Sequence, residues 1–513
     1  MGSVDHTAAG EDPFHDLSKD GCQDAEVLAR LGYRQVLYRT WGTLTAVALT
    51  ISAMSTLTSI SASFGTGLMM GGPAICVWGW IAVSAATLCI GLGMAELASA
   101  YPTSGGMYYW MSKLAGKRVG PWACWVTGWL NLLGQIAAVS AVAALAADLT
   151  ITMATMASGL DGKEPIEVDN KQYFGIFAAY ILLNAIMNSL GLAWLTLLTQ
   201  IGAFFNIAGV VLLCLVVPIV APRHRSAKYV FTKFDTRGAQ GVGITNPFYA
   251  AMLGLLLPAY SYTGVDGPVH MAEEVTGSET APPIAILYGI GIMFVGGLAM
   301  IIALLFSMKS ITRALNEDSE AGGSPIPQIL YDVFTDRYNN PRIGIALQII
   351  PLGGVFFCLV ATTTYVTRIL FCYSRDRAVP LPWLWSRMNK RTRSPLCALW
   401  VRGAEAPRPP TAPQQARGQP AIATVWAIVA TVIFCLPTEL PVDGENLNYA
   451  SVLLVGTFLM SNVWFFFPKY GAYKWFTGPA RTIDDDSVMG LEGGGAPGSM
   501  KKDVEFDYKD ADV

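Results

Sequence analysis

Residues 254–268 read Gly254-Leu-Leu-Leu-Pro258-Ala-Tyr260-Ser-Tyr-Thr-Gly264-Val-Asp266-Gly-Pro268. They place two prolines, three glycines and a run of polar side chains inside an otherwise apolar segment. In a bilayer, backbone N–H and C=O groups that leave a helix stay unbonded unless protein or enclosed water reaches them. The segment therefore predicts a membrane helix that unwinds where it lines a cavity enclosed by protein.

A weaker break of the same kind occurs nearer the N-terminus, in Ser52-Ala-Met-Ser55-Thr-Leu-Thr58-Ser59-Ile-Ser61. Interrupted helices at matching places in two halves of a chain mark the substrate site of inverted-repeat transporters, where helix ends receive the charged ends of the solute. A structural interpretation stays open for each hydroxyl, because Ser and Thr in a membrane helix often only bond the carbonyl four residues back.

The composition excludes an ordinary soluble protein. Hydrophobic residues make up 53% of the 513 residues and charged residues only 14%, against roughly 25% charged in a soluble domain. The formal net charge of -3 contains both signs, so nothing in it favours nucleic acid or a strongly acidic partner. The expected surroundings are a lipid bilayer.

Charge-free stretches map the membrane spans, because an ionised side chain is costly at the bilayer centre. Eight such stretches occur, and the first and third are long enough for two crossings of about 20 residues each. They lie between Arg39 and Glu96, Arg118 and Asp148, Lys171 and Arg223, Arg237 and Asp266, Glu279 and Lys309, Arg342 and Arg368, Arg417 and Glu439, and Glu445 and Lys469. We therefore expect an all-α polytopic membrane protein with about ten spans.

An even number of spans places both termini on one side of the membrane. Arg30, Arg34 and Arg39 precede the first span and indicate that this side is the cytoplasm, although the basic loop 223–237 then lies outside. The predicted parts are a cytoplasmic tail 1–40, a transporter core 41–374 with spans one to eight, a basic and Pro-rich cytoplasmic linker 375–420, the last two spans 421–468 and a cytoplasmic tail 469–513. The membrane is either the plasma membrane or an organelle membrane.

Several charged or polar groups lie at or near membrane depth and are candidates for function. Asp266 is a candidate proton partner, or else a cap for the second half of its broken helix. Candidates for a cytoplasmic gate or for proton coupling are Glu96, Glu273, Glu274 and Arg368. Asn131, Gln135 and Thr364 are expected to support the site by bonding neighbouring helices.

Enzyme chemistry and metal binding are not indicated. The nine cysteines show no CxxC or Cys/His spacing, so free core thiols are expected. The chain has only four histidines, and neither a His/Glu metal motif nor a nucleophile elbow occurs. We expect no cofactor.

Four motifs together resemble the amino acid/choline transporter family of the amino acid-polyamine-organocation superfamily, most closely plant bidirectional amino-acid transporters and GABA permeases. They are Met94-Ala-Glu96-Leu-Ala-Ser-Ala-Tyr101-Pro-Thr-Ser-Gly-Gly106-Met-Tyr-Tyr-Trp110, Thr127-Gly-Trp-Leu-Asn131-Leu-Leu-Gly-Gln135, Tyr262-Thr-Gly264-Val-Asp266 with His270-Met-Ala-Glu273-Glu274, and Tyr373-Ser-Arg375-Asp376. The similarity runs from about Leu31 to Pro479.

The resemblance implies a five-plus-five inverted-repeat fold and secondary active transport of amino acids or GABA, commonly with a proton as the coupled ion. It also implies that both broken helices bind the small-molecule substrate. The residues carried over are Ser55, Thr58 and Ser59 in the first broken helix, and Tyr260, Ser261, Tyr262, Thr263 and Gly264 in the second.

Two departures from the family pattern qualify this expectation. Ser59 stands where relatives resemble one another in having Gly, so its side chain is expected to narrow the pocket or stiffen the turn. After Arg393, the Pro-rich stretch 402–420 occupies the place of two family helices, so we expect helices nine and ten to be missing and ten spans to replace twelve. A non-transporting, truncated isoform that acts as a sensor or assembly partner is therefore the alternative function.

Overall fold

The computed structural model describes residues 19–33, 35, 37, 39–160, 164–385, 420–443 and 446–479. Helices are the regular elements of these ranges, and Trp41 and Val275 form an isolated parallel bridge. The expected N-terminal tail up to residue 18, the Pro-rich linker over 386–419 and the C-terminal tail from residue 480 lie outside the described residues. The predicted all-helical architecture is confirmed for the part that is described.

The N-terminal half contains α1 (Lys19–Arg30), α2 (Thr43–Met54), α3 (Thr56–Ala74), the π-helical turn η1 (Ile75–Gly79), α4 (Trp80–Ala100), α5 (Met107–Leu114), α6 (Gly116–Ser158), α7 (Asn170–Ser189) and α8 (Leu192–Val220). The middle of the chain contains α9 (Ala227–Thr232), α10 (Arg237–Gly241), α11 (Pro247–Gly254), α12 (Leu256–Ser261), the 3-10 helix η3 (Gly267–Met271) and α13 (Ala281–Ser307). The C-terminal part contains α14 (Ile311–Ala314), α15 (Pro325–Tyr338), α16 (Arg342–Ala346), α17 (Ile349–Arg375), α18 (Pro382–Trp385), α20 (Pro420–Cys435), α21 (Tyr449–Phe466) and η4 (Ala472–Lys474).

Six helical runs among the described residues are long and apolar enough to cross a membrane: Thr43–Ala100, Gly116–Ser158, Leu192–Val220, Ala281–Ser307, Arg342–Arg375 and Tyr449–Phe466. The first run has 58 residues and turns at Gly72, whose φ of 67° suits a glycine and which precedes Pro73. Pro247–Ser261 and Ala423–Cys435 are shorter apolar helices. The total of ten crossings stays a prediction.

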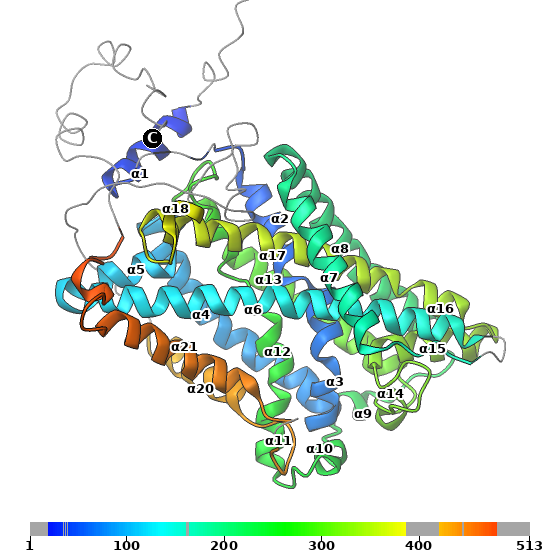
Figure 1. Cartoon of the computed structure of the whole chain (residues 1–513). Helices are drawn as coiled ribbons and strands as arrows, with labels where there is room; N and C mark the ends of the chain where they lie inside the picture. The colour runs from blue at the N-terminus through cyan, green and yellow to red at the C-terminus, as the bar shows by residue number, and fades with distance from the viewer. Residues whose placement is uncertain are drawn as a thin grey trace, which may run out of the picture.

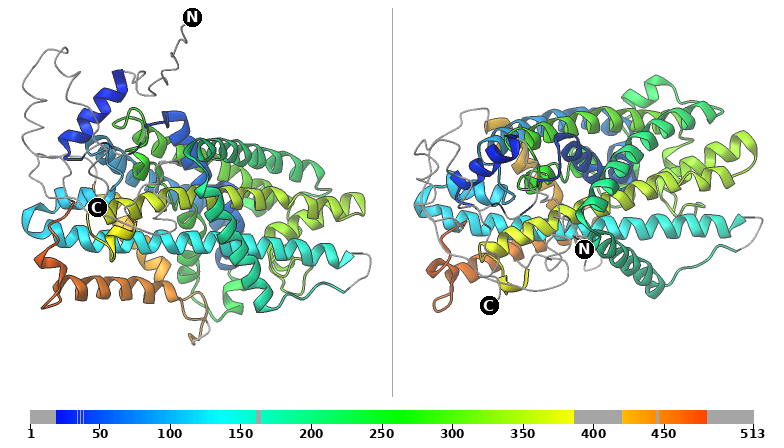
Figure 2. Two further views of the ribbon diagram at one scale, coloured as in Figure 1. Left: turned by 45° about the horizontal axis from the view of Figure 1, so that its top comes forward. Right: turned by 90° about the horizontal axis from the view of Figure 1, so that it is seen from above.

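The helices form one bundle around α13, which packs against α2, α4 and α8 (Figure 1 and Figure 2). The two short helices α11 and α12 pack against α3, and α17 packs against α6 and α2. The last two long helices lie on the outside of the bundle, α20 against α4 and α21 against α6. Segments that contain the two predicted breaks are therefore neighbours in space.

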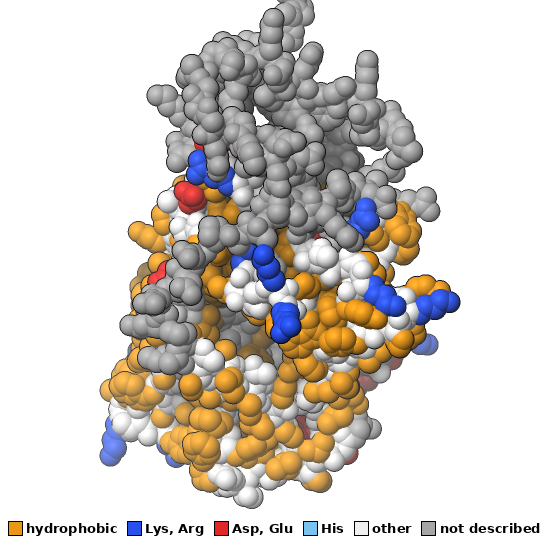
Figure 3. All heavy atoms as spheres, turned by 90° about the vertical axis from the view of Figure 1, so that its left-hand side faces the viewer, with side chains coloured by type: hydrophobic (Ala, Val, Ile, Leu, Met, Phe, Trp, Pro, Cys, Tyr) orange, Lys and Arg blue, Asp and Glu red, His pale blue; other side chains and the backbone are white. Residues whose placement is uncertain are grey.

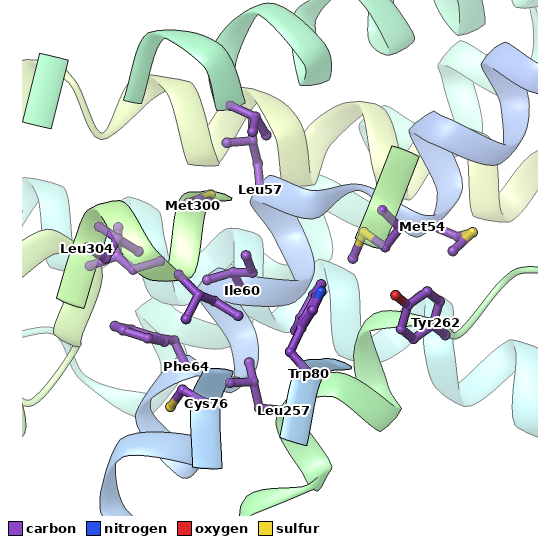
Figure 4. Close-up of a cluster of buried hydrophobic side chains, with 14 of the residues drawn as sticks. Met54, Leu57, Ile60, Phe64, Cys76, Trp80, Leu257, Tyr262, Met300 and Leu304 are labelled. Atoms are coloured by element: carbon purple, nitrogen blue, oxygen red, sulfur yellow. The ribbon is translucent and has the colours of Figure 1, made fainter. Parts of the chain in front are cut away.

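A buried apolar cluster holds α3, α4 and α12 together (Figure 4). Leu57, Trp80 and Leu257 have essentially no exposed surface. The Trp80 indole donates its N–H to the carbonyl of Phe294 on α13 at 3.1 Å. A Cβ at Gly297 would lie 2.0 Å from the Trp80 ring, so the glycine allows α13 to pack directly on this indole. This packing fixes the helices that carry the breaks.

Parts of both predicted tails pack onto the folded core. The sequence predicts a polar tail through residue 40, and within it Asp24 and Leu28 of α1 are buried. The predicted tail from residue 469 also packs inward, since Phe476 is buried and its ring lies 5.1 Å from that of Trp125. Local polarity gave no sign of this packing, because a few buried residues decide whether a terminal segment docks.

Candidate functional site

The first break lies at Ser55, between α2 and α3. Ser55 has φ 27° and ψ 100°, a backbone conformation that residues other than glycine rarely adopt. Its hydroxyl donates to Oδ1 of Asn206 at 2.5 Å and accepts from the backbone N–H and the hydroxyl of Thr58. The thiol of Cys358 on α17 donates to the carbonyl of Ala53 at 3.1 Å. Two side chains thus bond backbone groups beside the break, Ser55 at the N–H of Thr58 and Cys358 at the carbonyl of Ala53, while Asn206 holds the Ser55 hydroxyl.

Replacing Ser55 tests how the turn is held. We expect Ser55→Ala to lower the free energy of unfolding by about 1–2 kcal/mol, because it removes the cap of α3 and keeps the positive φ. Ser55→Gly should cost less, since glycine adopts this conformation without strain. Thermal unfolding of the two purified variants in detergent measures the difference. Equal losses in both variants would contradict the role of backbone strain at this position.

The second break follows Ser261, where α12 ends and Tyr262–Asp266 forms a series of turns before η3. Gly264 has φ 90°, which explains why a glycine occupies this position. The hydroxyl of Tyr262 lies 2.5 Å from that of Ser84 on α4, and its ring packs 6.0 Å from Trp80 (Figure 4). The chain is not helical over the stretch where the sequence places the break.

The two breaks meet inside the bundle. A Cβ built on Gly264 would lie 3.8 Å from Cβ of Ala53 and 3.1 Å from the hydroxyl of Tyr365 on α17. Tyr365 and Ala53 are buried, so this junction is enclosed by protein. Two helix interruptions that are about 210 residues apart in sequence therefore form one buried point, with α17 as its third wall.

The predicted substrate residues differ in their burial and in the hydrogen bonds that their side chains already make. Ser55, Thr58, Ser59, Ser261, Tyr262 and Gly264 are buried, Tyr260 is half-buried and Thr263 is exposed. The hydroxyl of Ser59 donates to the carbonyl of Ser55 at 2.9 Å, and that of Ser261 donates to the carbonyl of Leu257 at 2.7 Å. The structural interpretation thus holds for these two hydroxyls, which retain only an acceptor oxygen for a solute.

Asp266 lies just after the paired breaks and is bound from two sides. Oδ2 of Asp266 accepts from the amide of Gln135 on α6 at 3.0 Å and lies 3.2 Å from Nε2 of His270. The side chain makes no capping hydrogen bond to η3, so the interpretation of Asp266 as a helix cap is wrong. Its carboxyl instead joins the break to α6 and to the segment that leads to Glu273.

Two ion pairs tie this segment to the end of α17. Arg368 donates to both carboxylate oxygens of Glu274, at 2.8 and 3.2 Å. Arg375 likewise donates to both carboxylate oxygens of Glu273, at 2.9 and 3.2 Å. All four side chains are at least nine-tenths buried. Glu273, Glu274 and Arg368 are therefore brought together as the sequence predicts, whereas Glu96 lies exposed on α4 outside this cluster.

The N-terminal segment closes over the same ion pairs. Asp24 accepts from the backbone N–H groups of Gly277 and Ser278, both at 2.8 Å. Burial, and then the charge of Asp376, raise the pKa of Tyr33 well above its usual value. The phenol therefore stays protonated and donates to Asp376 at 3.3 Å, while the Arg375 guanidinium lies 4.1 Å from its ring centre. Residues from three separate segments are thus bonded together at this end of the bundle.

The predicted supporting residues bond helices to one another. Asn131 on α6 donates to the hydroxyl of Tyr373 at 3.3 Å, and Thr364 donates to Asn188 on α7 at 2.9 Å. Sequence reasoning missed Asn206, Ser104, Tyr365 and His270 as members of the site. Asn206 could have been found from the sequence, because it is an amide side chain inside the apolar run of α8. Ser104 and His270 lie within the family motifs quoted above, but their part in the site, like that of Tyr365, becomes recognisable only from their contacts.

An apolar cavity of about 680 Å³ lies on another side of the first break. It opens between α8 and α13 and is lined by Ile51, Thr56, Asn206, Val210, Tyr288 and Val295, among others. Tyr288 and Val295 are largely exposed on the outer surface of the bundle. Most of its lining side chains are apolar, and Thr56 and Asn206 are its polar members.

Long apolar helices that are interrupted at one buried point are typical of integral multi-pass membrane transporters. The model of the family described as "Amino acid permease" matches residues 42–404. The chain is 33% identical to the "Amino-acid permease BAT1 homolog" of Oryza sativa subsp. japonica, over 89% of this chain and 95% of that protein. The chain belongs to the amino acid permease family of the amino acid-polyamine-organocation superfamily.

Two further relatives lie in plants and yeast. The "Amino-acid permease BAT1" of Arabidopsis thaliana is 31% identical over 89% of this chain and 96% of its own length. The "GABA-specific permease" of Saccharomyces cerevisiae is 29% identical over 77% of this chain and 66% of its own length. The resemblance found in the four sequence motifs is thereby confirmed.

Proposed function

We propose that this chain is a secondary active transporter of amino acids or amino-acid-like solutes, with GABA among the candidates, and that it works by alternating access. The observation that carries this proposal is the meeting of the two breaks at Ala53 and Gly264. The membership in the amino acid permease family supports it. Rocking of one helix group against another would expose the junction to each side in turn.

The helix ends at the junction match the two charges of an amino acid. The N-terminus of α3 at Thr56 carries a partial positive charge that suits the carboxylate of the solute. The C-termini of α2 at Met54 and of α12 at Ser261 carry partial negative charges that suit its ammonium group. A zwitterion is therefore the solute class that this backbone geometry would recognise.

We further propose that both termini are cytoplasmic and that the ion pairs of Arg368 and Arg375 form the cytoplasmic gate. Among the described residues, Lys and Arg side chains are spread over the face that carries α5 and α18, and fewer Asp and Glu side chains are visible there (Figure 3). Cytoplasmic loops are typically enriched in Lys and Arg. In this arrangement the conformation described here is closed toward the cytoplasm, in the plasma membrane or an organelle membrane.

Uptake into proteoliposomes tests the proposal. The purified chain is reconstituted, and radiolabelled alanine, arginine and GABA are supplied with and without an imposed pH gradient. We expect at least one of these solutes to accumulate above protein-free liposomes, and we expect the pH gradient to increase its accumulation, because the coupled ion is proposed to be a proton. Equal accumulation with and without the pH gradient would contradict proton coupling.

The alternative function predicts a different result in the same experiment. A non-transporting isoform that acts as a sensor or assembly partner would bind a solute without accumulating it. The observation behind this alternative is the Pro-rich composition of the stretch 402–420, which we expect to stand in place of two family helices. Binding measured by scintillation proximity on the reconstituted protein, together with zero accumulation, would favour it over transport.

A further inference from the structure

His270 is a fully buried histidine that the proposed transport site does not yet use. It has 0% exposed surface, and both of its ring nitrogens are within hydrogen-bond distance of an oxygen. Nδ1 lies 3.0 Å from the carbonyl oxygen of Ser104, in the loop between α4 and α5. Nε2 lies 3.2 Å from Oδ2 of Asp266, beside the second break. The ring therefore joins the break to a loop at the gate.

A count of protons on these atoms determines the charge state of the pair. The carbonyl of Ser104 is an acceptor only, so Nδ1 carries the hydrogen of that bond. If Nε2 were then unprotonated and Asp266 ionised, two lone pairs would face each other at 3.2 Å. The contact is favourable only when a proton lies between the two atoms, either as imidazolium with carboxylate or as neutral imidazole with carboxylic acid.

We propose that Asp266 and His270 together form the proton-binding site of the transporter, and that the pair holds one proton while this end of the bundle is closed and loses it when this end opens. This inference rests on the proposed proton-coupled transport and names the side chains that bind the proton.

The contacts of Ser104 connect the proton to the gate. The backbone N–H of Ser104 donates to Oε1 of Glu273, and the backbone N–H of Glu273 donates to the hydroxyl of Ser104, both at 3.2 Å. Glu273 is also the partner of Arg375. A Cβ at Gly106 would lie 2.8 Å from the His270 ring, so the loop is fitted closely to the imidazole. Loss of the proton would weaken His270–Asp266 and loosen this loop.

The other ionisable groups around the pair are largely neutralised or neutral. Arg375 and Arg368 of α17 are paired with Glu273 and Glu274. From α17 the phenols of Tyr365 and Tyr373 also face Asp266, and from α6 the uncharged amide of Gln135 contacts it. The Tyr365 ring stacks 6.3 Å from that of His270. The shared proton is thus the charge at this place that can change while the ion pairs of Arg368 and Arg375 stay intact.

Hydrogen–deuterium exchange of the peptide that covers residues 101–106 tests the proposal without any solute. The full-length protein in lipid nanodiscs is labelled from about pH 5 to about pH 8, the range in which histidine titrates, and the rates are corrected for intrinsic chemical exchange. We expect exchange in the wild-type peptide to become about tenfold faster as the pH rises, because one charge-assisted contact is lost.

Two variants separate a proton site from a purely structural contact. In Asp266→Asn the amide donates to Nε2 at every pH, so we expect slow exchange throughout and no pH dependence. In His270→Gln we expect fast exchange at every pH. Glu273→Gln is the matched control, because it weakens the gate and leaves the proton site intact. Its exchange should be faster overall but should keep the pH dependence.

Wild-type exchange that does not change with pH overturns the proposal, whatever the variants do. A pH dependence that survives in Asp266→Asn or in His270→Gln also overturns it, and so does its loss in Glu273→Gln, which would assign the proton to Glu273. Size-exclusion profiles show whether each variant is folded. If only one of Asp266→Asn and His270→Gln folds, that variant alone is enough to test the proposal. Normal pH dependence together with absent uptake would instead contradict the transport function and leave the proton site standing.

Discussion

Gly264→Leu is expected to reduce solute uptake in proteoliposomes to the level of protein-free vesicles, while membrane insertion stays intact. Position 264 has φ 90°, where a leucine backbone is strained by roughly 1–2 kcal/mol. The new Cβ would lie 3.1 Å from the Tyr365 hydroxyl, and the rest of the side chain would fill the junction with Ala53. The variant should therefore lose both the shape of the turn and the space for a solute.

The control is the same substitution at a glycine with open space. A Cβ at Gly291 on α13 meets no atom within 4 Å, so Gly291→Leu should insert and transport as the wild type does. Uptake of radiolabelled alanine, arginine and GABA is compared after both variants are brought to equal protein amounts in the vesicles. Retained uptake in Gly264→Leu would place the solute elsewhere than at the paired breaks.

Glu274→Gln is expected to cause a large loss of stability, of about 3–5 kcal/mol, because it leaves the Arg368 charge buried without its carboxylate. The side chains of both partners are only 3% exposed. Arg368 would keep its bonds to the carbonyl and hydroxyl oxygens of Thr364 and Thr367, but these carry no compensating charge. Thermal unfolding in detergent measures the loss through the shift in midpoint.

Glu320→Gln provides the comparison, since Glu320 binds Arg313 at 2.6 Å with side chains that are 39% and 36% exposed. An exposed pair is worth about 1 kcal/mol or less. The double variant Arg368→Met with Glu274→Met should recover much of the stability lost in Glu274→Gln, since removing both charges removes the desolvation cost. If Glu274→Gln costs no more than Glu320→Gln, the buried pair is not what holds this end closed.

The backbone breaks could be predicted from local sequence because their cause is local. Proline and glycine change the allowed backbone conformations of the residues beside them, and Gly264 and Pro268 stand inside an apolar segment where such residues are costly. The pairing of Arg368 with Glu274 was partly predictable for a similar reason, since charges near the end of a membrane span need partners. The family motifs added the expectation that the two breaks form one site.

The identity of the side chains around the breaks depended on contacts between distant segments. Asn206 bonds to Ser55 from 151 residues away, and Ser104 contacts His270 from 166 residues away. The sequence shows neither contact, because each residue alone resembles the many polar groups that only link helices; the family motifs contain Ser104 and His270 but do not show that the two residues meet. Asp24 was likewise assigned to a tail, although it bonds to Gly277 and Ser278, which lie 253 and 254 residues further along the chain.

By itself, the sequence determined that the chain is a helical membrane protein of a transporter family and where two of its helices unwind. These features follow from the composition of short segments, since hydrocarbon excludes charge and tolerates no unbonded backbone. Only the tertiary structure decided that the breaks meet at Ala53 and Gly264, that α17 closes them and that Asp266 binds His270 instead of capping a helix. Those outcomes depend on which helix faces pack together, a property of the whole bundle that no single segment encodes.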